Sequence, residues 1–264
     1  MITRQAVLAV LVRPSMVPWY QVVLARKHSS IMPADIVFRV DLPHGRCVGV
    51  RVPGANERMT QPLIHDEELE LLASIAPARK ATWFAGRVAL HAALMDLGVA
   101  SVPILATQRG APELPEGAAG SISHKRTLAV ALAARKQHGL SLGVDIEPIP
   151  VLPPSPTEPG WDNRPDISSR VMTPEELAAL AAVPDHLRRR EVVLHFSIKE
   201  ALYKAINPII GRYVSFQEAT VLPACDGSVA VTLALAKHEG PFSVEARWSE
   251  IDGHLLTTAA VRVI

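Results

Sequence analysis

The chain has 264 residues, of which 48% are hydrophobic and 20% are charged, a balance typical of a folded globular protein and not of a disordered or fibrous one. Its 27 Lys and Arg against 26 Asp and Glu leave a formal net charge of +1, so no overall basic field favours nucleic acid or an anionic membrane as a partner. The apolar run at residues 6–12 is far shorter than the ~20 residues that cross a bilayer, and no signal-cleavage site follows it. Cys47 and Cys225 have neither disulfide nor zinc spacing. We therefore expect a cytoplasmic protein.

The apolar runs that alternate with turn signals predict strands in both halves of the chain. These strands cover residues 5–12, 37–40, 47–52, 121–133, 140–147, 215–222, 229–235, 242–248 and 254–263. Seven of the 22 prolines fall between residues 148 and 165, a stretch that supports neither a helix nor a central strand. We interpret it as an exposed loop or insertion.

Three helices are predicted between these strands. Apolar side chains at helical spacing predict a helix over residues 79–97, which ends before Gly98. A capping box followed by proline opens a second helix that ends near residue 182, and a third extends from Asp185 to about residue 207, where Pro208 ends it. Each half thus has strands, a long helix and more strands, which indicates two related α+β halves and not a parallel βαβ sheet.

Asp145 and Glu147 lie on one face of the predicted strand 140–147, because successive side chains alternate between the two faces. Side chains two residues apart on one face are ~7 Å apart, close enough for two carboxylates to share one divalent cation. Oxygen ligands without a nearby His or Cys favour Mg²⁺, or Mn²⁺, over zinc. The alternative, an edge strand whose outer face is solvated, is common for charged positions and is the preferred interpretation of this pair taken alone.

Lys199, Glu200 and Lys204 lie within the predicted helix that begins at Asp185. Glu200 followed by Lys204 is an i,i+4 pair of the kind that stabilises exposed helices by ~0.2–0.5 kcal/mol. Surface ion pairs of this type are common, so the helix alone favours that interpretation. The functional alternative is a third carboxylate for the same cation, flanked by two lysines that neutralise a bound phosphate.

The segment GSISHKR at residues 120–126 offers a second anion-binding feature. Small residues followed by His124 and Lys125 allow backbone N–H groups and a donating side chain to meet an anion. A lone histidine is more often structural, and the segment is not a GxSxG elbow, so a hydrolase based on Ser123 has little support.

Arg79 and Arg87 fall on one stripe of the predicted helix 79–97, together with Trp83. Two guanidinium groups on one stripe suit a phosphomonoester. A solvated helix face, or burial of the arginine stems against Trp83, explains the same pattern.

Four segments stand in one order along the chain: GRVALHAAL from Gly86, GSISH from Gly120, GVDIE from Gly143 and FSIKEALYKA from Phe196. This order resembles the signatures of the 4′-phosphopantetheinyl transferase superfamily. The resemblance is strongest to its larger, monomeric type, which activates siderophore, nonribosomal-peptide and polyketide synthases, and it covers roughly residues 77–220. Two positions that are usually tryptophan hold Phe196 and Leu114 here, and Lys125 stands where small or thiol residues are common.

The resemblance implies a fold of two similar α+β halves related by pseudo-two-fold symmetry, with coenzyme A bound in the cleft between them. The N-terminal half would cover residues 1–137. The C-terminal half, residues 138–264, would carry the metal site and the proline-rich insertion at residues 148–165. The resemblance further implies a monomer.

The resemblance also implies roles for individual residues. Asp145, Glu147 and Glu200 would hold Mg²⁺ against the pyrophosphate of coenzyme A. Lys199 and Lys204 would contact the phosphates, and Ser123 would help to position the pyrophosphate. Arg79, Arg87 and His124 would recognise the adenosine 3′-phosphate. The groups expected to act in catalysis are Glu200, Asp145 and Lys199.

The expected reaction transfers 4′-phosphopantetheine from coenzyme A to a serine of an apo acyl or peptidyl carrier protein, with Mg²⁺ or Mn²⁺, and releases adenosine 3′,5′-bisphosphate. A non-catalytic coenzyme-A-binding module that serves as a scaffold is the first alternative, and a Mg²⁺-dependent phosphohydrolase is the second. The sequence does not select the carrier's pathway, which can be fatty-acid, polyketide, peptide or siderophore synthesis.

Overall fold

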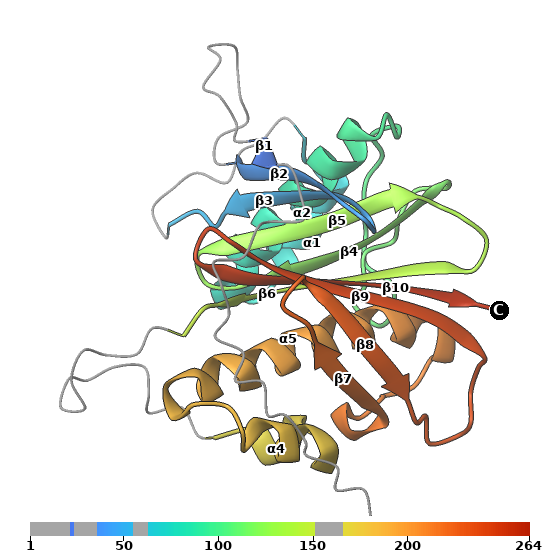
Figure 1. Cartoon of the computed structure of the whole chain (residues 1–264). Helices are drawn as coiled ribbons and strands as arrows, with labels where there is room; N and C mark the ends of the chain where they lie inside the picture. Colours follow the sequence, from blue (N-terminus) through green and yellow to red (C-terminus); the bar gives the residue numbers. More distant parts are fainter. Residues whose placement is uncertain (1–21, 24–35, 55–62, 151–165) are drawn as a thin grey trace, which may run out of the picture.

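The computed structural model describes residues 22–23, 36–54, 63–150 and 166–264, whose strands form two five-stranded antiparallel sheets (Figure 1). The first sheet, in the order β1-β2-β3-β5-β4, consists of β1 (Val22–Val23), β2 (Ile36–Leu42), β3 (Gly45–Arg51), β4 (Ala118–His124) and β5 (Leu128–Arg135). The second, in the order β6-β10-β9-β8-β7, consists of β6 (Leu140–Pro148), β7 (Ala219–Pro223), β8 (Ser228–Leu233), β9 (Phe242–Ile251) and β10 (His254–Val263). The predicted α+β class is confirmed.

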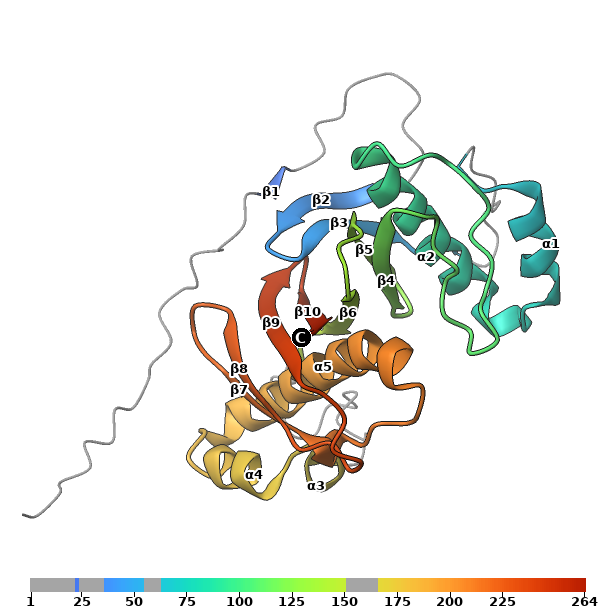
Figure 2. The same ribbon diagram turned by 90° about the vertical axis from the view of Figure 1, so that its right-hand side faces the viewer.

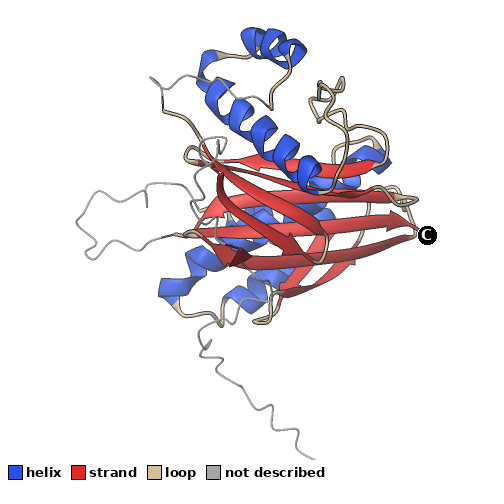
Figure 3. Ribbon diagram, turned by 90° about the horizontal axis from the view of Figure 1, so that it is seen from above, coloured by secondary structure: helices blue, strands red, loops and turns tan. Residues whose placement is uncertain are grey.

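Helices lie on both outer sides of the strands, as Figure 3 shows. They are α1 (Asp66–Ser74), α2 (Pro77–Asp96), α3 (Ser168–Val171), α4 (Pro174–Leu180) and α5 (Asp185–Ile210), with a 3₁₀ turn at Phe216–Glu218. The long helix α2 packs on β3, β4 and β5, and the long helix α5 packs on β6 and β10 (Figure 2). In the described ranges, no helix combines the length and apolar character needed to cross a bilayer.

Apolar side chains of both sheets fill the space between them. Phe38 and Val130 of the first sheet pack there with Val144 and Ile146 of β6. The strand β6 is the end strand of its own sheet, but β4 of the other sheet lies beside it, and the backbone N–H of Val144 donates to Ser121 Oγ. Because β6 is covered by the other sheet on one face and by α5 on the other, the solvated edge strand considered for this segment is wrong.

Two of the predicted strands differ from the structure by more than a few residues at their ends. The run at residues 121–133 is a hairpin and not one strand, since the chain turns after His124 and the N–H of Lys125 donates to the carbonyl of Leu128. The run at residues 215–222 becomes a strand only at Ala219, because Ser215 caps a 3₁₀ turn by accepting from the N–H of Gln217. The predicted strand 5–12 and residues 151–165 of the proline-rich stretch lie outside the described residues.

The helices differ from expectation in where α5 ends and in two short helices that were not predicted, α1 and α3. Pro208 does not end α5, because its missing N–H costs only one hydrogen bond in the last turn, and the helix continues to Ile210. Gly211 ends it instead, in the left-handed conformation at φ 73°. The short helices α1 and α3 have nine and four residues, so neither is long enough to show a sustained apolar pattern in the sequence.

The buried ring of His44, in the turn between β2 and β3, leads us to expect that the free energy of unfolding depends on pH. Its ring is buried, with Nδ1 2.9 Å from Thr258 Oγ1 of β10, and burial lowers its pKa to about 4 although the nearby Glu245 opposes the shift. A histidine that resists protonation only when folded costs stability as the pH falls from about 6.5 towards 4. This loss is of order 3 kcal/mol.

Urea unfolding at several pH values measures this effect in wild type and in His44→Phe. We expect His44→Phe to lose less stability than wild type across that pH window. The control His138→Ala removes an exposed imidazole and should follow wild type. Parallel pH profiles for wild type and His44→Phe would contradict the assignment.

Candidate functional site

Gly143 lets the backbone of α5 approach β6 closely. A Cβ at position 143 would lie only 1.8 Å from the carbonyl oxygen of Ala201, so no side chain fits there. Gly143 precedes Asp145 by two residues on the same face of the strand, and Ala201 directly follows Glu200 in the helix. The glycine therefore brings the strand acid and the helix acid to the same place, where α5 crosses β6 (Figure 2).

Asp145 is held by both halves of the molecule and is only 3% exposed. Its Oδ1 accepts hydrogen bonds from Ser123 Oγ of β4 at 2.7 Å and from Lys204 Nζ of α5 at 2.8 Å. Its Oδ2 accepts from Ser197 Oγ of α5 at 2.9 Å. Two hydroxyls and one ammonium thus fix the orientation of this carboxylate and balance its charge.

Glu147 and Glu200 complete a group of three acids. Glu147 is buried and forms an ion pair with Lys125, which extends from the end of β4. The pKa of Glu200 is raised, first by burial and then by the negative charge of Asp145, while Lys204 and Lys125 oppose the shift. We call Asp145, Glu147, Glu200, Lys125 and Lys204 the acid–lysine cluster. Asp145 pairs with Lys204, Glu147 pairs with Lys125, and Glu200 interacts with both lysines, so the five residues belong to one electrostatic unit.

The acids of this cluster fit a hard divalent cation. Three carboxylates are the donor type that Mg²⁺ and Mn²⁺ prefer, and the repulsion between Glu200 and Asp145 is the kind that a bound cation relieves. In the structure, Lys125 and Lys204 neutralise the acids instead. The carboxylate oxygens are not among the sets of described ligand atoms that all lie within 4.8 Å of one another, so a shared ion requires them to move closer together.

A positive region borders the acids on the side of β4. The pKa of His124 is lowered by burial and then by the charges of Lys204, Arg79 and Lys125. These groups come from α5, α2 and the β4–β5 turn, so elements far apart in sequence place three cations around one imidazole. Arg79 is exposed, whereas His124 is half-buried. Arg79 and Lys204 thus act electrostatically on His124, and recognition of an adenosine 3′-phosphate by Arg79 and His124 stays a prediction.

Arg87 lies deeper in the N-terminal half than Arg79. Its side chain is 3% exposed, stacks on Trp83 at 4.9 Å and donates from Nη2 to the carbonyl of Leu105. Burial lowers its pKa to about 10, although Glu68 opposes the shift. Among the described residues, its buried Nε and Nη1 have no hydrogen-bond partner, so they are available to an anion. A phosphate contact by Arg87 stays a prediction.

The structure corrects the expectation for Lys199. Its ammonium is buried and donates to the Glu176 carboxylate at 2.7 Å and to the carbonyls of Val171 and Phe216 at 2.8 and 2.9 Å. Burial lowers the pKa of Lys199, and Glu176 opposes this shift. All three ammonium hydrogens thus have protein acceptors, and Lys199 faces α4 and not the acid–lysine cluster. Neither a phosphate contact nor a catalytic role fits this position.

Two residues of the site, Ser197 and Thr257, were not anticipated from the sequence, and Lys125 was anticipated only as an anion contact and not as the partner of Glu147. Lys125 pairs with Glu147, Ser197 binds Asp145, and Thr257 of β10 pairs in register with Asp145 and lies 2.9 Å from Ser197 Oγ. Ser197 precedes Glu200 by three residues, a spacing that places both on one helix face and was a usable signal. The pairing of Lys125 with Glu147 joins the two sheets, and no local pattern indicates it.

A cavity of about 1130 Å³ opens beside the cluster. Lys125, Glu147 and Phe196 line the part next to the acids, and Arg188 and Arg189 of α5 line another part. The Lys125 ammonium also lies 5.9 Å from the centre of the Phe196 ring. Glu147, one of the three acids, therefore lines a space that is large enough for a substrate and is also lined by several cationic groups.

Comparisons with known proteins agree with this geometry. Residues 67–134 match the model of the 4′-phosphopantetheinyl transferase N-terminal domain, and residues 141–259 match that of the 4′-phosphopantetheinyl transferase superfamily. The 4′-phosphopantetheinyl transferase Svp of Streptomyces mobaraensis is 33% identical over 212 residues, which cover 75% of this chain and 79% of Svp. The 4′-phosphopantetheinyl transferase Npt of Nocardia iowensis is 30% identical over 211 residues, covering 74% and 88%. Enterobactin synthase component D of Salmonella typhimurium is 32% identical over 190 residues, covering 70% and 74%. The first match contains β4, and the second contains α5 and nearly all of β6, which are the elements that form the cluster. This chain therefore belongs to the 4′-phosphopantetheinyl transferase superfamily, enzymes that transfer phosphopantetheine from coenzyme A to carrier proteins.

Proposed function

We propose that the acid–lysine cluster is the catalytic centre of a Mg²⁺-dependent transfer of 4′-phosphopantetheine to a carrier-protein serine, with release of adenosine 3′,5′-bisphosphate. The observation that carries this proposal is the meeting of three carboxylates and two lysines at the junction of the two sheets.

Asp145, Glu147 and Glu200 are the residues that would hold the cation, and Mn²⁺ suits the same oxygens. When bound, the cation supplies neutralisation of the charge that develops on the pyrophosphate oxygens. Lys204 and Lys125 act on the same charge, because their ammonium groups already face the acids and need only turn towards a bound diphosphate. Arg79, His124 and the unpartnered nitrogens of Arg87 would bind the 3′-phosphate of coenzyme A.

The transfer step is a displacement at the β-phosphorus of coenzyme A. The serine oxygen forms a new bond to this phosphorus, and the bond from the phosphorus to the bridging oxygen breaks. Adenosine 3′,5′-bisphosphate leaves with that oxygen, and the hydroxyl proton passes to a carboxylate. Glu200 suits this last role, because burial and Asp145 raise its pKa and thus its basicity when ionised.

The test is the mass of an apo carrier domain after incubation with the enzyme, coenzyme A and Mg²⁺. We expect the carrier to gain the mass of phosphopantetheine and adenosine 3′,5′-bisphosphate to appear in equal amount. A chelator should abolish both, and Mg²⁺ should restore them. No gain on carriers of several types would contradict the proposal. Coenzyme A binding without transfer would favour a scaffold, and release of phosphopantetheine without a carrier would favour a phosphohydrolase.

Arg79 is expected to recognise the 3′-phosphate of coenzyme A. Replacing it by Ala removes one cation beside His124, so we expect KM for coenzyme A to rise about tenfold, which corresponds to about 1.4 kcal/mol. With dephospho-coenzyme A, which lacks this phosphate, wild type and Arg79→Ala should have similar KM values. The control is Lys80→Ala, because Lys80 is turned away towards the carbonyl of Ala73. An equal loss with both substrates would show that Arg79 does not recognise this group.

A further inference from the structure

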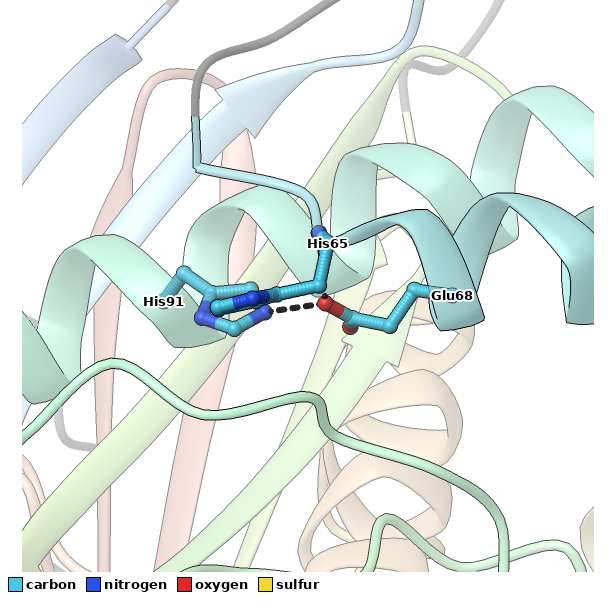
Figure 4. Close-up of side chains that lie close together, drawn as sticks. All are labelled: His65, Glu68 and His91. Atoms are coloured by element: carbon cyan, nitrogen blue, oxygen red, sulfur yellow. Dashed lines mark hydrogen bonds and ion pairs between the residues drawn. The ribbon is translucent and has the colours of Figure 1, made fainter.

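His65, Glu68 and His91 place three metal-ligating side chains together between α1 and α2 (Figure 4). His65 directly precedes α1, Glu68 is in the first turn of that helix, and His91 lies in α2. One ligand atom from each residue lies within 4.8 Å of the ligand atoms of the other two. Among the described residues, no other three His, Cys, Asp or Glu side chains meet this spacing. We call this group the His–Glu–His site.

Glu68 is the centre of this site and is fully buried. Its Oε2 lies 2.7 Å from His91 Nε2 and accepts from the backbone N–H of His65 at 3.2 Å. Its Oε1 is buried without a hydrogen-bond partner among the described residues. An unsatisfied buried acceptor destabilises the folded chain, so the site has an unused ligand atom that a cation would satisfy.

The two histidines lie next to each other beside the Glu68 carboxylate (Figure 4). Their ring centres are 5.5 Å apart, His91 is 4% exposed, and His65 is only half-buried, which leaves the site a path to solvent. Ser101 Oγ lies 2.9 Å from His65 Nε2 and helps to orient this ring, as outer partners of metal-binding histidines commonly do.

We propose that the His–Glu–His site binds one divalent transition-metal ion of the zinc type, which ties α1 to α2. Two imidazoles and one carboxylate are a zinc ligand set that leaves a fourth position for water. Imidazole ligands disfavour Mg²⁺, which separates this site from the three carboxylates of the acid–lysine cluster. The only buried side chains of α1 are those of Glu68 and Leu72, so a shared ion would add substantially to the attachment of this helix.

Arg87 is the charge that opposes a cation at this site. It lies one turn before His91 in α2, and Glu68 acts on it electrostatically without a hydrogen bond between them. In the metal-bound site, Glu68 would serve both the ion and Arg87. We therefore expect weaker binding than at a zinc site without a nearby arginine.

The experiment titrates Co²⁺ into the untagged full chain after chelator treatment and dialysis, with Mg²⁺ in excess to occupy oxygen-ligand sites. We expect one Co²⁺ per chain, with the strong visible absorption of four-coordinate Co²⁺. Equimolar Zn²⁺ should displace it, whereas more Mg²⁺ should not. Zn²⁺ should also raise the melting temperature of the metal-free chain, because an ion that binds only the folded state stabilises it.

His65→Ala and Glu68→Gln should each weaken Co²⁺ binding by at least about tenfold. His65 is half-buried and outside the helices, so its variant tests the site even if replacement of the buried His91 prevents folding. The control His186→Ala removes an exposed imidazole in α5 and should bind Co²⁺ as wild type does. Absence of four-coordinate absorption, displacement by Mg²⁺, or unchanged binding in His65→Ala would each overturn the proposal.

Discussion

Replacing Asp145 by Asn is expected to reduce phosphopantetheine transfer by about a thousandfold. The amide has the shape of the carboxylate and can still accept from a serine hydroxyl, but it removes the charge that faces Lys204 and that would hold a cation. The loss should appear in the rate of carrier modification at saturating coenzyme A and Mg²⁺. Mn²⁺ binding, followed by electron paramagnetic resonance, should weaken in the same variant.

Asp252→Asn is the matched control for this prediction. Asp252 is exposed in the turn between β9 and β10, at φ 47°, a conformation that Asn tolerates as well as Asp. The same chemical change there should leave the transfer rate and the melting temperature unaltered. A transfer rate near wild type in Asp145→Asn would exclude Asp145 from the catalytic centre. Loss of transfer with unchanged Mn²⁺ binding would show that Asp145 belongs to the catalytic centre but does not bind the metal ion.

The position of the strand acids followed from the sequence. Alternation along residues 140–147 places Asp145 and Glu147 on one face, and this side of β6 does meet α5 and its Glu200. Alternation does not predict that Asp145 and Glu147 are buried. Charged side chains facing outwards favour a solvated strand, and only the packing of β6 between β4 and α5 shows that both acids are enclosed.

The residues of α5 show what spacing along a helix predicts and what it leaves open. Successive residues of an α-helix point about 100° apart, so Lys199 and Glu200 face different neighbours, whereas Glu200 and Lys204 share a face. The structure follows this geometry, with Lys204 on Asp145 and Lys199 on Glu176. The partner of Lys199 lies in α4, 23 residues away, and no pattern within α5 identifies it.

The remaining part of the site depends on how the two sheets meet. Ser123 and Lys125 reach the acids because β4 lies beside β6, a neighbour relation between end strands of different sheets. Hydrophobic patterning within each strand specifies its faces but not which strand of another sheet lies next to it. For the same reason the His–Glu–His site, which joins α1 to α2, could not be predicted once α1 had been missed.

Replacing Lys199 by Met is expected to destabilise the fold by about 3–5 kcal/mol, because it leaves the fully buried carboxylate of Glu176 without its counter-charge. Urea unfolding measures this loss. Lys204→Met is the comparison, since Lys204 is partly exposed and faces the acid–lysine cluster. Lys204→Met should lose less stability than Lys199→Met and should raise KM for coenzyme A.

The double substitution Lys199→Met with Glu176→Gln separates a structural role from a phosphate contact. Removing both charges should recover part of the lost stability, because no unpaired ion then remains buried. Recovery should be incomplete, since Glu176 also accepts from the N–H groups of Thr173 and Val221 at 2.6 Å, and an amide cannot accept both bonds equally well. If Lys199 acts only through its pair with Glu176, any rise in KM for coenzyme A in Lys199→Met comes from the damaged fold. The double variant, which is more stable, should then have a KM close to the wild-type value. A high KM in both Lys199→Met and the double variant, despite the recovered stability of the latter, would show that Lys199 contacts the phosphates directly. Both variants lack the Lys199 ammonium, so both would lose such a contact.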